Sequence, residues 1–534
     1  MGRRSWWGWG REGAGLSDER RRRLGMLLGT QIDTSGLVAM APPALGDVSL
    51  PKCRLTKPLS WLSDDPFDRA GHTYGKAFRD VVRALGGDLS VAPDLVATPA
   101  DEEQLVQTLD WADEHGYAVI PYGGGSSVVG GVEARCRDEF PGVISLDLGG
   151  LGGVREIDRT SRAARIGAGT LGPDLEKELA RHDLTLRHFP QSFEFSTVGG
   201  WIATRAGGHF ATLYTHIDDF VQSLTVVTPA GKIETRRLPG SGAGPSPDRL
   251  FLGSEGALGI ITEAWLRLQD RPRHRASASF AFADFYAAGE AARLLAQSGL
   301  FPANCRILDP IEALINGIGD GATTFLLVGF ESADHPVDAW LSRAETIAAG
   351  AGGASTASRP TSAALPSADI VEGDGDGAAG RWKKMFLRGP YLRDALVEMG
   401  MIVETFETAI TWDRFEGFHR TVKETAERMV TSICGGGVVS SRVTHVYPDG
   451  AAPYFTVIAP AKAGSQVRQW DDIKAAVSQA LIDGGGTITH HHAVGRDHRP
   501  WYDQQRPELF GEALRQAKRS LDPNGILNPG CLVG

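Results

Sequence analysis

The sequence predicts an α+β fold divided among more than one domain. Its 534 residues are too many for a single hydrophobic core. Stretches with the apolar spacing of amphipathic helices alternate with short strand-like runs, which favours sheets with helices packed on them. The composition, with 42% hydrophobic and 22% charged residues, is that of a globular protein. The 67 glycines indicate many turns, and three glycine-rich clusters fall within residues 121–263.

Charge and cysteine content exclude several classes of protein. The net charge of -10 and the isoelectric point near 5.8 argue against a nucleic-acid partner, because neutralising phosphates needs an excess of Lys and Arg. An anionic substrate would therefore need a local basic pocket. The five cysteines are scattered and lack a CxxC pair, so they indicate neither a disulfide framework nor a zinc site, and a reducing cytoplasm fits. No apolar run approaches the roughly 18–20 residues that span a bilayer, and we expect a cytoplasmic protein.

Residues 1–90 predict an irregular, partly helical arm. Trp6, Trp7 and Trp9 lie among arginines, and a run of four arginines follows at 20–23. This combination could contact an anionic membrane surface, which would make the protein peripheral at a membrane. The alternative, which we favour, is that the tryptophans pack on the protein itself.

Residues 91–270 predict the first α+β unit. Thr98 as N-cap and Pro99 at the first helical position would begin a helix that ends near His115. A strand at 117–120 then leads into the stretch 121–131. Further strands are expected at 143–148, in a hairpin over 154–168 and at 221–228, with a helix over 173–182.

The stretch 121–131, with the sequence PYGGGSSVVGG, has the properties of a phosphate cradle. Three successive glycines let the backbone come close to a ligand, and two serines add hydroxyl donors to an anion-binding nest. It is not a P-loop, because Gly130 is followed by Gly131 and Val132. It is not a dinucleotide fingerprint, because no helix can begin there. A plain glycine-rich hairpin is the alternative, but further clusters at 188–208 and 253–263 favour the cradle.

Residues 271–485 predict a second α+β domain. Helical stretches at 285–297 and 340–348 alternate with a strand at 323–330. Residues 350–380 are rich in Gly, Ala, Ser and Pro, which is typical of a solvent loop. Residues 486–534 form a C-terminal segment, and no internal repeat is apparent.

The ordered motifs resemble a known family. PYGGGSSVVGG, FSTVGGWIATRAGG and GSEGALGIITEA look like the FAD-binding domain of the vanillyl-alcohol oxidase/p-cresol methylhydroxylase (PCMH-type) superfamily. WWGWG, PQSFEFSTVGGW, YLRDALVEMGMIVETFETAITWDR, SRVTHVYPDG and GGTITHHHAVG resemble the alkyldihydroxyacetonephosphate synthase branch of it. The resemblance covers most of the chain. It implies a PCMH-type FAD-binding domain of two α+β subdomains, an α+β cap domain for substrate, and a C-terminal segment that returns to the FAD domain.

The resemblance implies FAD as cofactor. Residues 121–131 contain no histidine, where many relatives carry the one bonded to the flavin, so we expect noncovalent FAD. Gln191 departs from the family's usual Asp, which removes a carboxylate near the pyrophosphate, although the amide can still donate and accept. The residues expected to contact FAD are Pro121, Tyr122, Gly123, Gly124, Gly125, Ser126, Ser127, His188, Pro190, Gln191, Ser192, Ser196, Thr197, Gly200, Thr204, Arg205, Ala206, Gly207, Glu255, Gly256, Leu258, Gly259, Ile260 and Ile261.

His490, His491 and His492 match the family's active-site triple histidine. On a strand suggested by residues 487–489, the side chains of His490 and His492 would share one face. Such a pair could ligate a metal, but no third ligand lies nearby in sequence, and we expect no metal site. The other interpretation is that these imidazoles shuttle protons and donate to an anion.

Three further residues are implied by the resemblance. Tyr454 lies twelve residues after Arg442, as the active-site tyrosine does in the family, and is expected to act as an acid, base or hydrogen-bonding group. Arg306 and Arg393 match the family's functional arginines, whose forked donors suit a phosphate or the flavin. Without the motifs, Tyr454 would be assigned to the core and both arginines to the solvated surface.

The resemblance implies an alkylglycerone-phosphate synthase, a transferase that exchanges the acyl chain of an acyl-dihydroxyacetone phosphate for a fatty alcohol in ether lipid biosynthesis. The alternative is an FAD-linked oxidoreductase, a dehydrogenase or oxidase of a 2-hydroxy acid such as D-lactate or glycolate. Those relatives carry a Glu-His-Gly string in place of the triple histidine, and its absence here ranks this function second. We expect a lipid-like small-molecule substrate and a homodimer.

Overall fold

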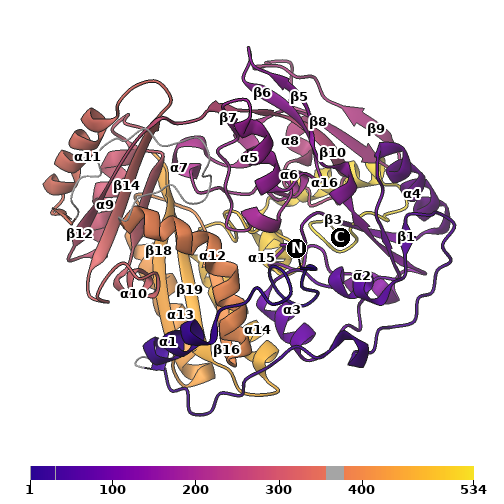
Figure 1. Ribbon diagram of the computed structural model, residues 1–534, viewed down its shortest axis with the longest axis horizontal. Helices are drawn as coiled ribbons and strands as arrows, with labels where there is room; N and C mark the ends of the chain where they lie inside the picture. Colours follow the sequence, from indigo (N-terminus) through magenta and orange to yellow (C-terminus); the bar gives the residue numbers. More distant parts are fainter. Residues whose placement is uncertain (1, 30–31, 357–377, 534) are drawn as a thin grey trace.

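The computed structural model of the protein describes residues 2–29, 32–356 and 378–533, and Figure 1 shows two groups of sheets with the chain ends between them. The first sheet has the strand order β1-β2-β4-β3, and its neighbours β2, β4 and β3 run parallel. The glycine-rich loop begins where β3 ends. The elements are β1 (Leu62–Ser63), α2 (Pro66–Gly71), α3 (Phe78–Leu85), β2 (Leu95–Ala97), α4 (Glu102–His115), β3 (Ala118–Tyr122) and β4 (Val143–Asp147).

The helix α4 begins later than predicted. The carboxylate of Asp101 accepts from the backbone N–H of Gln104 at 2.9 Å, so Asp101 is the N-cap. Thr98 instead donates its hydroxyl to the carbonyl of Trp61, and its prediction as N-cap was wrong. The helix ends at His115 as predicted, followed by Gly116 in the left-handed conformation at φ 64°.

The second sheet is antiparallel, in the order β5-β6-β10-β8-β9. The predicted hairpin over 154–168 forms β5 and β6, and β8 has the predicted bounds. Helix α6 packs on this sheet and carries part of the second glycine-rich cluster. The elements are β5 (Val154–Asp158), β6 (Ala163–Gly167), α5 (Gly172–Ala180), β7 (Leu184–Thr185), α6 (Val198–Thr204), α7 (Ala211–Tyr214), β8 (Val221–Thr228), β9 (Gly231–Glu234), α8 (Asp248–Phe251), β10 (Ile260–Arg267) and β11 (Gln269–Asp270).

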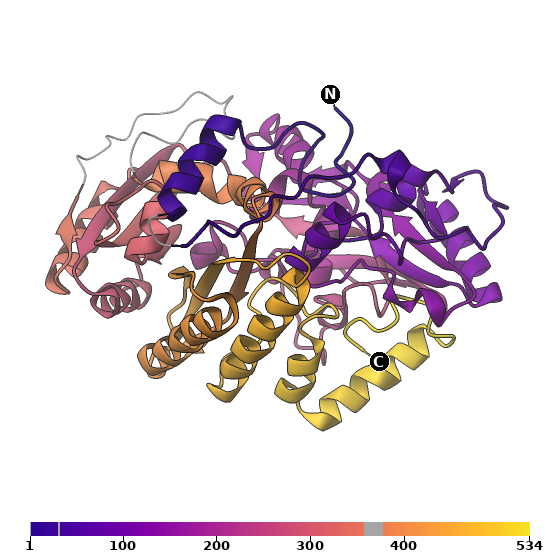
Figure 2. The ribbon, with the colours of Figure 1, turned by 90° about the horizontal axis from the view of Figure 1, so that it is seen from below.

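The third sheet has eight strands, and seven follow the order β15-β12-β14-β13-β18-β19-β16, with β17 paired to β19. Figure 2 shows α12 on the face opposite α13 and α14. The predicted insert at 350–380 falls largely on 357–377, outside the described residues. The elements are β12 (His274–Phe282), α9 (Phe285–Ala296), β13 (Asn304–Leu308), α10 (Pro310–Ile315), β14 (Thr324–Ser332), α11 (Asp338–Gly350), β15 (Ala354–Ser355), α12 (Ala378–Glu398), β16 (Met401–Glu407), β17 (Ile410–Thr411), α13 (Phe415–Cys434), β18 (Val438–Val446), β19 (Gly450–Pro460) and α14 (Gln466–Asp483).

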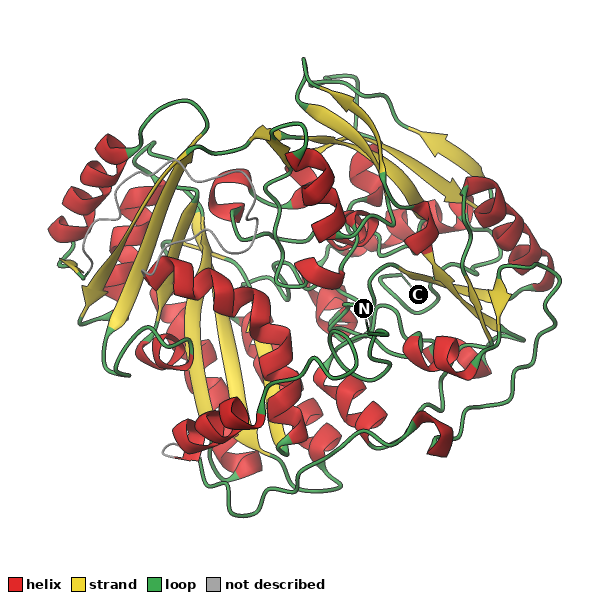
Figure 3. Ribbon diagram, in the orientation of Figure 1, coloured by secondary structure: helices red, strands yellow, loops and turns green. Residues whose placement is uncertain are grey.

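The C-terminal segment returns to the first sheet. After α15 (Arg499–Gln505) and α16 (Glu508–Leu521), Leu527 forms a parallel bridge with Val119, and the backbone N–H of Asn528 donates to the Val119 carbonyl. Figure 3 shows this segment running in loops between the helices and the sheet. The α+β class and the returning C-terminus, both predicted from the sequence, are confirmed.

The N-terminal arm lies against the protein. Trp6 and Trp9 are buried, and Trp7 packs against two apolar clusters. The ring of Trp9 lies edge-on to Phe195, with 5.6 Å between the centroids. These contacts favour the alternative that the tryptophans pack on the protein itself, and membrane contact stays a prediction. Helix α1 (Asp18–Gly29) follows, and none of the helices in the described part of the chain has the length and apolar character needed to cross a bilayer.

Candidate active site

One cavity of about 310 Å³ brings together residues from the arm, both halves of the molecule and the C-terminal segment. The glycine-rich loop and the second cluster form one wall. Its predicted FAD contacts are Gly123, Gly124, Gly125, Ser126, Ser127, Pro190, Gln191, Ser192, Ser196, Thr197, Gly200, Thr204, Ala206 and Gly207. Arg393, Tyr454, His491 and His492 line the same cavity.

The glycine-rich loop is pressed against the second cluster. A Cβ at Gly124 would overlap the carbonyl oxygen of Phe195 and lie 2.8 Å from Cα of Ser196, so no side chain fits there. Gly125 has φ of 64°, which favours glycine. The hydroxyl of Ser127 accepts from the backbone N–H of Gly131 at 2.9 Å, which closes the turn. A bare backbone with adjacent hydroxyls fits the phosphates of a dinucleotide cofactor such as FAD.

Several predicted FAD contacts lie behind this wall. His188 packs on Trp201 at 5.1 Å between ring centroids, and burial lowers its pKa to about 3. The guanidinium of Arg205 instead donates to Asp218 at 2.7 Å. None of these other predicted contacts lines the cavity: Pro121, Tyr122, His188, Arg205, Glu255, Gly256, Leu258, Gly259, Ile260 and Ile261.

The third cluster holds the C-terminal segment. The buried carboxylate of Glu255 accepts from the backbone N–H groups of Val494 and Gly495, each at 2.9 Å. A Cβ on Gly256 would overlap the ring of Pro121, so this cluster also supports the base of the loop. These residues position the wall rather than form it.

The triple histidine is not on a strand. The backbone N–H groups of His490, His491 and His492 all donate to the carboxylate of Glu407, at 2.9 Å from His491 and 2.8 Å from His492. Converging on one carboxylate bends the chain, so the side chains do not alternate. Burial raises the pKa of Glu407 to about 7. The predicted pairing of His490 with His492 was wrong: Nδ1 of His490 shares a 3.0 Å hydrogen bond with Nδ1 of His491.

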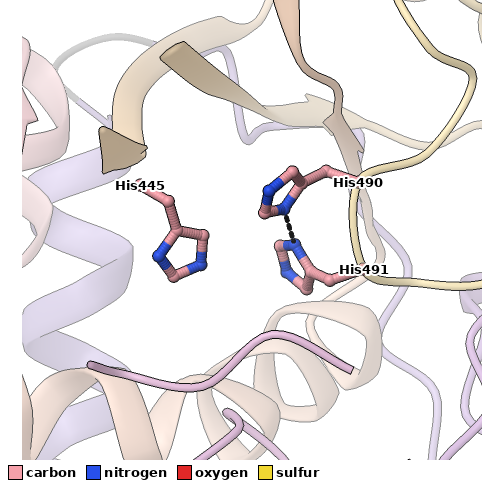
Figure 4. Close-up of side chains that lie close together, drawn as sticks. All are labelled: His445, His490 and His491. Carbon is pink, nitrogen blue, oxygen red and sulfur yellow. Dashed lines mark hydrogen bonds between the residues drawn. The ribbon is translucent and has the colours of Figure 1, made fainter. Parts of the chain in front are cut away.

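A fourth imidazole, from His445, faces the same place (Figure 4). Its ring stacks beside that of His490 with centroids 5.2 Å apart. The register of β18 on β19 shifts between Val443 and His445, and this bulge turns His445 toward the cavity that Arg442 also lines. Nitrogens of His445, His490 and His491 lie within 4.8 Å of one another, close enough to hold a metal ion. Two of them already hydrogen-bond to each other.

Neighbouring strands place the tyrosine. Tyr454 lies opposite Arg442 on β18 and opposite Glu407 on β16. The guanidinium of Arg442 lies 3.7 Å from the Tyr454 ring centroid and donates to Glu312 at 2.6 Å. The Tyr454 and His491 rings are nearly parallel, with centroids 6.1 Å apart. Burial raises the pKa of Tyr454, so its hydroxyl stays protonated at neutral pH.

The two predicted arginines differ in position. Arg393 on α12 lines the cavity, donates to the carbonyl of Lys76 and pairs with Asp394 at 2.6 Å. Arg306 on β13 is buried, does not line the cavity and donates to the carbonyl of His209 at 2.7 Å. Burial lowers the pKa of Arg306 to about 9. Arg306 therefore lies behind the cavity wall, and Arg442 lines the cavity.

Lys76, which sequence reasoning missed, lies beside Arg393 in the cavity wall. Its side chain is 3% exposed, and burial, with Arg4 and Arg393 nearby, lowers its pKa to about 8. Arg4 donates to the carbonyl of Gly124 at 3.1 Å. These cations form a basic region beside the glycine-rich loop in an otherwise acidic protein.

Known proteins share this sequence and architecture. The family model described as "FAD binding domain" matches residues 93–236, and "FAD linked oxidases, C-terminal domain" matches 271–532. Alkyldihydroxyacetonephosphate synthase of Dictyostelium discoideum is 30% identical over 498 residues, which cover 88% of this chain and 78% of that protein. The chain belongs to the alkyldihydroxyacetonephosphate synthase family. Its cofactor is FAD.

Solved structures agree with this placement. A structure of alkyldihydroxyacetonephosphate synthase is 25% identical, covers 98% of both chains and has a TM-score of 0.81. p-Cresol methylhydroxylase, 16% identical over 88% of this chain and 93% of its own, has a TM-score of 0.69 and shares the fold. The PCMH-type architecture predicted from the sequence is confirmed.

Five side chains that line the cavity or lie next to it were not predicted as site residues from the sequence: Lys76, His216, Arg442, His445 and Tyr447. Arg442, His445 and Tyr447 were in the quoted SRVTHVYPDG motif and could have been found from it. The signal for His216 and Lys76 is absent, because each lies in a stretch without a distinctive pattern.

Proposed function

We propose that the protein exchanges the acyl chain of an acyl-dihydroxyacetone phosphate for a fatty alcohol, giving an ether lipid precursor. The observation that carries the proposal is the composition of one continuous cavity. It joins a glycine-rich phosphate cradle, a basic region, a tyrosine with several histidines, and an apolar wall. The apolar wall includes Phe78, Leu396, Val403 and Ile458, which suits a long alkyl chain.

The loop at 123–127 and the wall at 190–207 would hold FAD noncovalently. Their backbone N–H groups and hydroxyls suit its phosphates, and the loop offers no histidine for a covalent bond. Bound FAD supplies an electrophilic ring system, a chemistry that no side chain of the cavity provides.

Arg393 and Lys76 would bind the substrate phosphate. Both line the cavity, and the carboxylate of Asp394 that pairs with Arg393 also accepts from the backbone N–H of Trp9. The charges that act on Lys76 include the cations Arg4 and Arg393 and the carboxylates of Asp394 and Asp80. Three cations beside two carboxylates leave a net positive region for an anion.

Tyr454 and His491 would handle protons at the reacting carbon. The raised pKa of Tyr454 keeps it a donor, and the Arg442 cation over its ring stabilises negative charge on the phenol oxygen when the proton moves. Burial lowers the pKa of His491 well below its usual value, so the neutral ring can accept a proton.

A homodimer, a cytoplasmic location and peripheral contact with a membrane remain predictions. Sedimentation of the pure protein, alone and with vesicles of anionic lipid, measures the first and the last of these. We expect a dimer that sediments with the vesicles only weakly, since Trp6 and Trp9 of the arm are buried.

The direct test incubates the pure yellow protein with palmitoyl-dihydroxyacetone phosphate and labelled hexadecanol. We expect a labelled ether lipid and release of palmitate, with the absorbance of oxidised flavin unchanged after turnover. The 2-hydroxy acid function predicts instead that D-lactate or glycolate bleaches the flavin without oxygen. Bleaching by either acid with no ether product would overturn the proposal.

A further inference from the structure

A chain of hydrogen bonds leads from the cavity wall through side chains that the proposed catalytic set does not use. His491 lines the cavity, and its Nδ1 is bonded to Nδ1 of His490 at 3.0 Å. On the far side of His490, Nε2 lies 2.9 Å from the hydroxyl of Tyr447 and 3.2 Å from Nε2 of His216. Tyr447 and His216 do not line the cavity, and both are partly exposed.

We propose that His490 and His216, with Tyr447 orienting the His490 ring, form a relay that carries the proton of the incoming alcohol from the cavity to solvent. The inference rests on the proposed function, because that reaction leaves a proton to remove. The alcohol R–OH loses its hydrogen when its oxygen becomes the ether oxygen, and the acyl chain departs as a carboxylate. A free carboxylate stays ionised near neutral pH, so neither product keeps the proton.

The proton moves through four transfers. His491 accepts it from the alcohol at Nε2 and gives the proton on its own Nδ1 to Nδ1 of His490. His490 then gives its Nε2 proton to Nε2 of His216, which releases its Nδ1 proton to water. The hydroxyl oxygen of Tyr447 accepts from the same Nε2–H of His490 and orients that ring. Each imidazole gains one proton and gives one up, so no charge remains in the site.

The environment keeps the rings neutral and close together. Burial lowers the pKa of both His490 and His491 well below its usual value, so each ring retains one N–H donor and one lone pair. Gly207 permits the approach: an added Cβ there would lie 3.3 Å from Cβ of His491 and 3.4 Å from Cδ2 of His216. A backbone bridge between Gly207 and His216 fixes the outer imidazole.

The outer end is suited to receive the proton. Burial lowers the pKa of His216, the carboxylates of Asp218 and Asp219 oppose that shift, and the Arg205 cation adds to it. The Asp219 side chain is 50% exposed, so a proton that reaches this end meets solvent.

The test uses holoenzyme and rescue by an added base. In His216→Ala, the outer imidazole is replaced by a gap, and we expect turnover to fall about 100-fold with FAD content unchanged, at the lower end of the roughly 10²–10⁴-fold contribution of a proton-transfer group. Free imidazole at constant pH and ionic strength should restore turnover in proportion to its concentration. In His216→Gln, the gap stays filled, and we expect the same loss without rescue. Tyr447→Phe should lower turnover with the flavin spectrum unchanged.

The control is His335→Ala, whose exposed imidazole contacts Asp334, Ser332 and the ring of Trp340, far from the triple histidine in sequence. It should keep full turnover and show no response to imidazole. Two results would overturn the relay while leaving the proposed function intact, provided that the wild type makes the ether product. In the first, His216→Ala keeps the turnover of the wild type. In the second, His216→Ala loses turnover and imidazole does not restore it. Absence of ether product from wild type would overturn the proposed function and remove the proton that the relay carries. A stoichiometric metal ion on His490 and His491 would also overturn it, because the ion would occupy their lone pairs.

Discussion

The substitution Gly124→Ala tests how closely the glycine-rich loop is held against the second cluster. The added methyl would overlap the carbonyl oxygen of Phe195 and lie 2.7 Å from its carbonyl carbon and 2.8 Å from Cα of Ser196. All three atoms are backbone, so no rotation of a side chain relieves the overlap. Overpacking of this kind costs about 1–3 kcal/mol.

We expect the cost to appear in cofactor binding. Phe195 and Ser196 are buried, and Ser196 accepts from the indole N–H of Trp201 at 2.6 Å, so the loop rather than the second cluster must move. FAD would then have to return the loop to its place, which raises its dissociation constant about 5- to 150-fold at roughly 1.4 kcal/mol per factor of ten.

The assay is titration of FAD into apoprotein, followed by quenching of flavin fluorescence. The control is Gly242→Ala, since no atom lies within 4 Å of a Cβ at Gly242 and its φ is not in the left-handed region. Gly242→Ala should bind FAD as wild type does. Wild-type FAD affinity and melting temperature in Gly124→Ala would refute the close packing of this loop.

Three further predictions concern the cofactor bond, the tyrosine and buried histidines. Acid precipitation should leave the pellet colourless and FAD in the supernatant; a yellow pellet would contradict noncovalent binding. Tyr454→Phe should keep FAD and lose about 10²–10⁴-fold in turnover, as expected for loss of an acid–base group. The control Tyr117→Phe should keep the turnover of the wild type. Full activity in Tyr454→Phe would contradict the proposed acid–base role of Tyr454. Burial lowers the pKa of His419 to about 3, so the unfolded chain binds a proton below pH 6.5 that the folded chain does not. The free energy of unfolding therefore decreases as the pH falls below 7, and His419 accounts for about 2 kcal/mol of that decrease at pH 5. Urea unfolding at both pH values should show a smaller loss for His419→Gln and the wild-type loss for His335→Gln; equal losses in both variants would contradict the assignment.

Elements with a strong local pattern could be predicted from the sequence. The strand at 221–228 and the hairpin over 154–168 are bounded by turn residues and formed as predicted. The start of α4 was missed because Thr98 and Asp101 are both good N-caps. What decides between them is a reciprocal pair: Gln104 accepts from the N–H of Ala100, and its own N–H donates to Asp101.

The triple histidine shows what a local pattern omits. Its β-branched neighbours suggested a strand, but the partner that bends the chain, Glu407, lies more than 80 residues away. No spacing within 486–492 encodes that contact. Motif resemblance pointed to these residues, of which His491 and His492 line the cavity and His490 does not, while their mutual geometry depended on a carboxylate from another strand.

The register of three neighbouring strands assembles the reactive wall. Arg442, Tyr454 and Glu407 lie in line across β18, β19 and β16, so a one-residue slip of β19 would turn Tyr454 to the opposite face of the sheet. Regular alternation on β18 would place His445 on the face opposite Arg442, because the two residues are three positions apart. The bulge between Val443 and His445 interrupts this alternation and brings His445 to the same face as Arg442. The side chains of Arg442 and His445 therefore both line the cavity. The glycine-rich loop explains the cofactor, whereas the chemistry depends on this bulge and on the carboxylate that bends the histidine loop toward it.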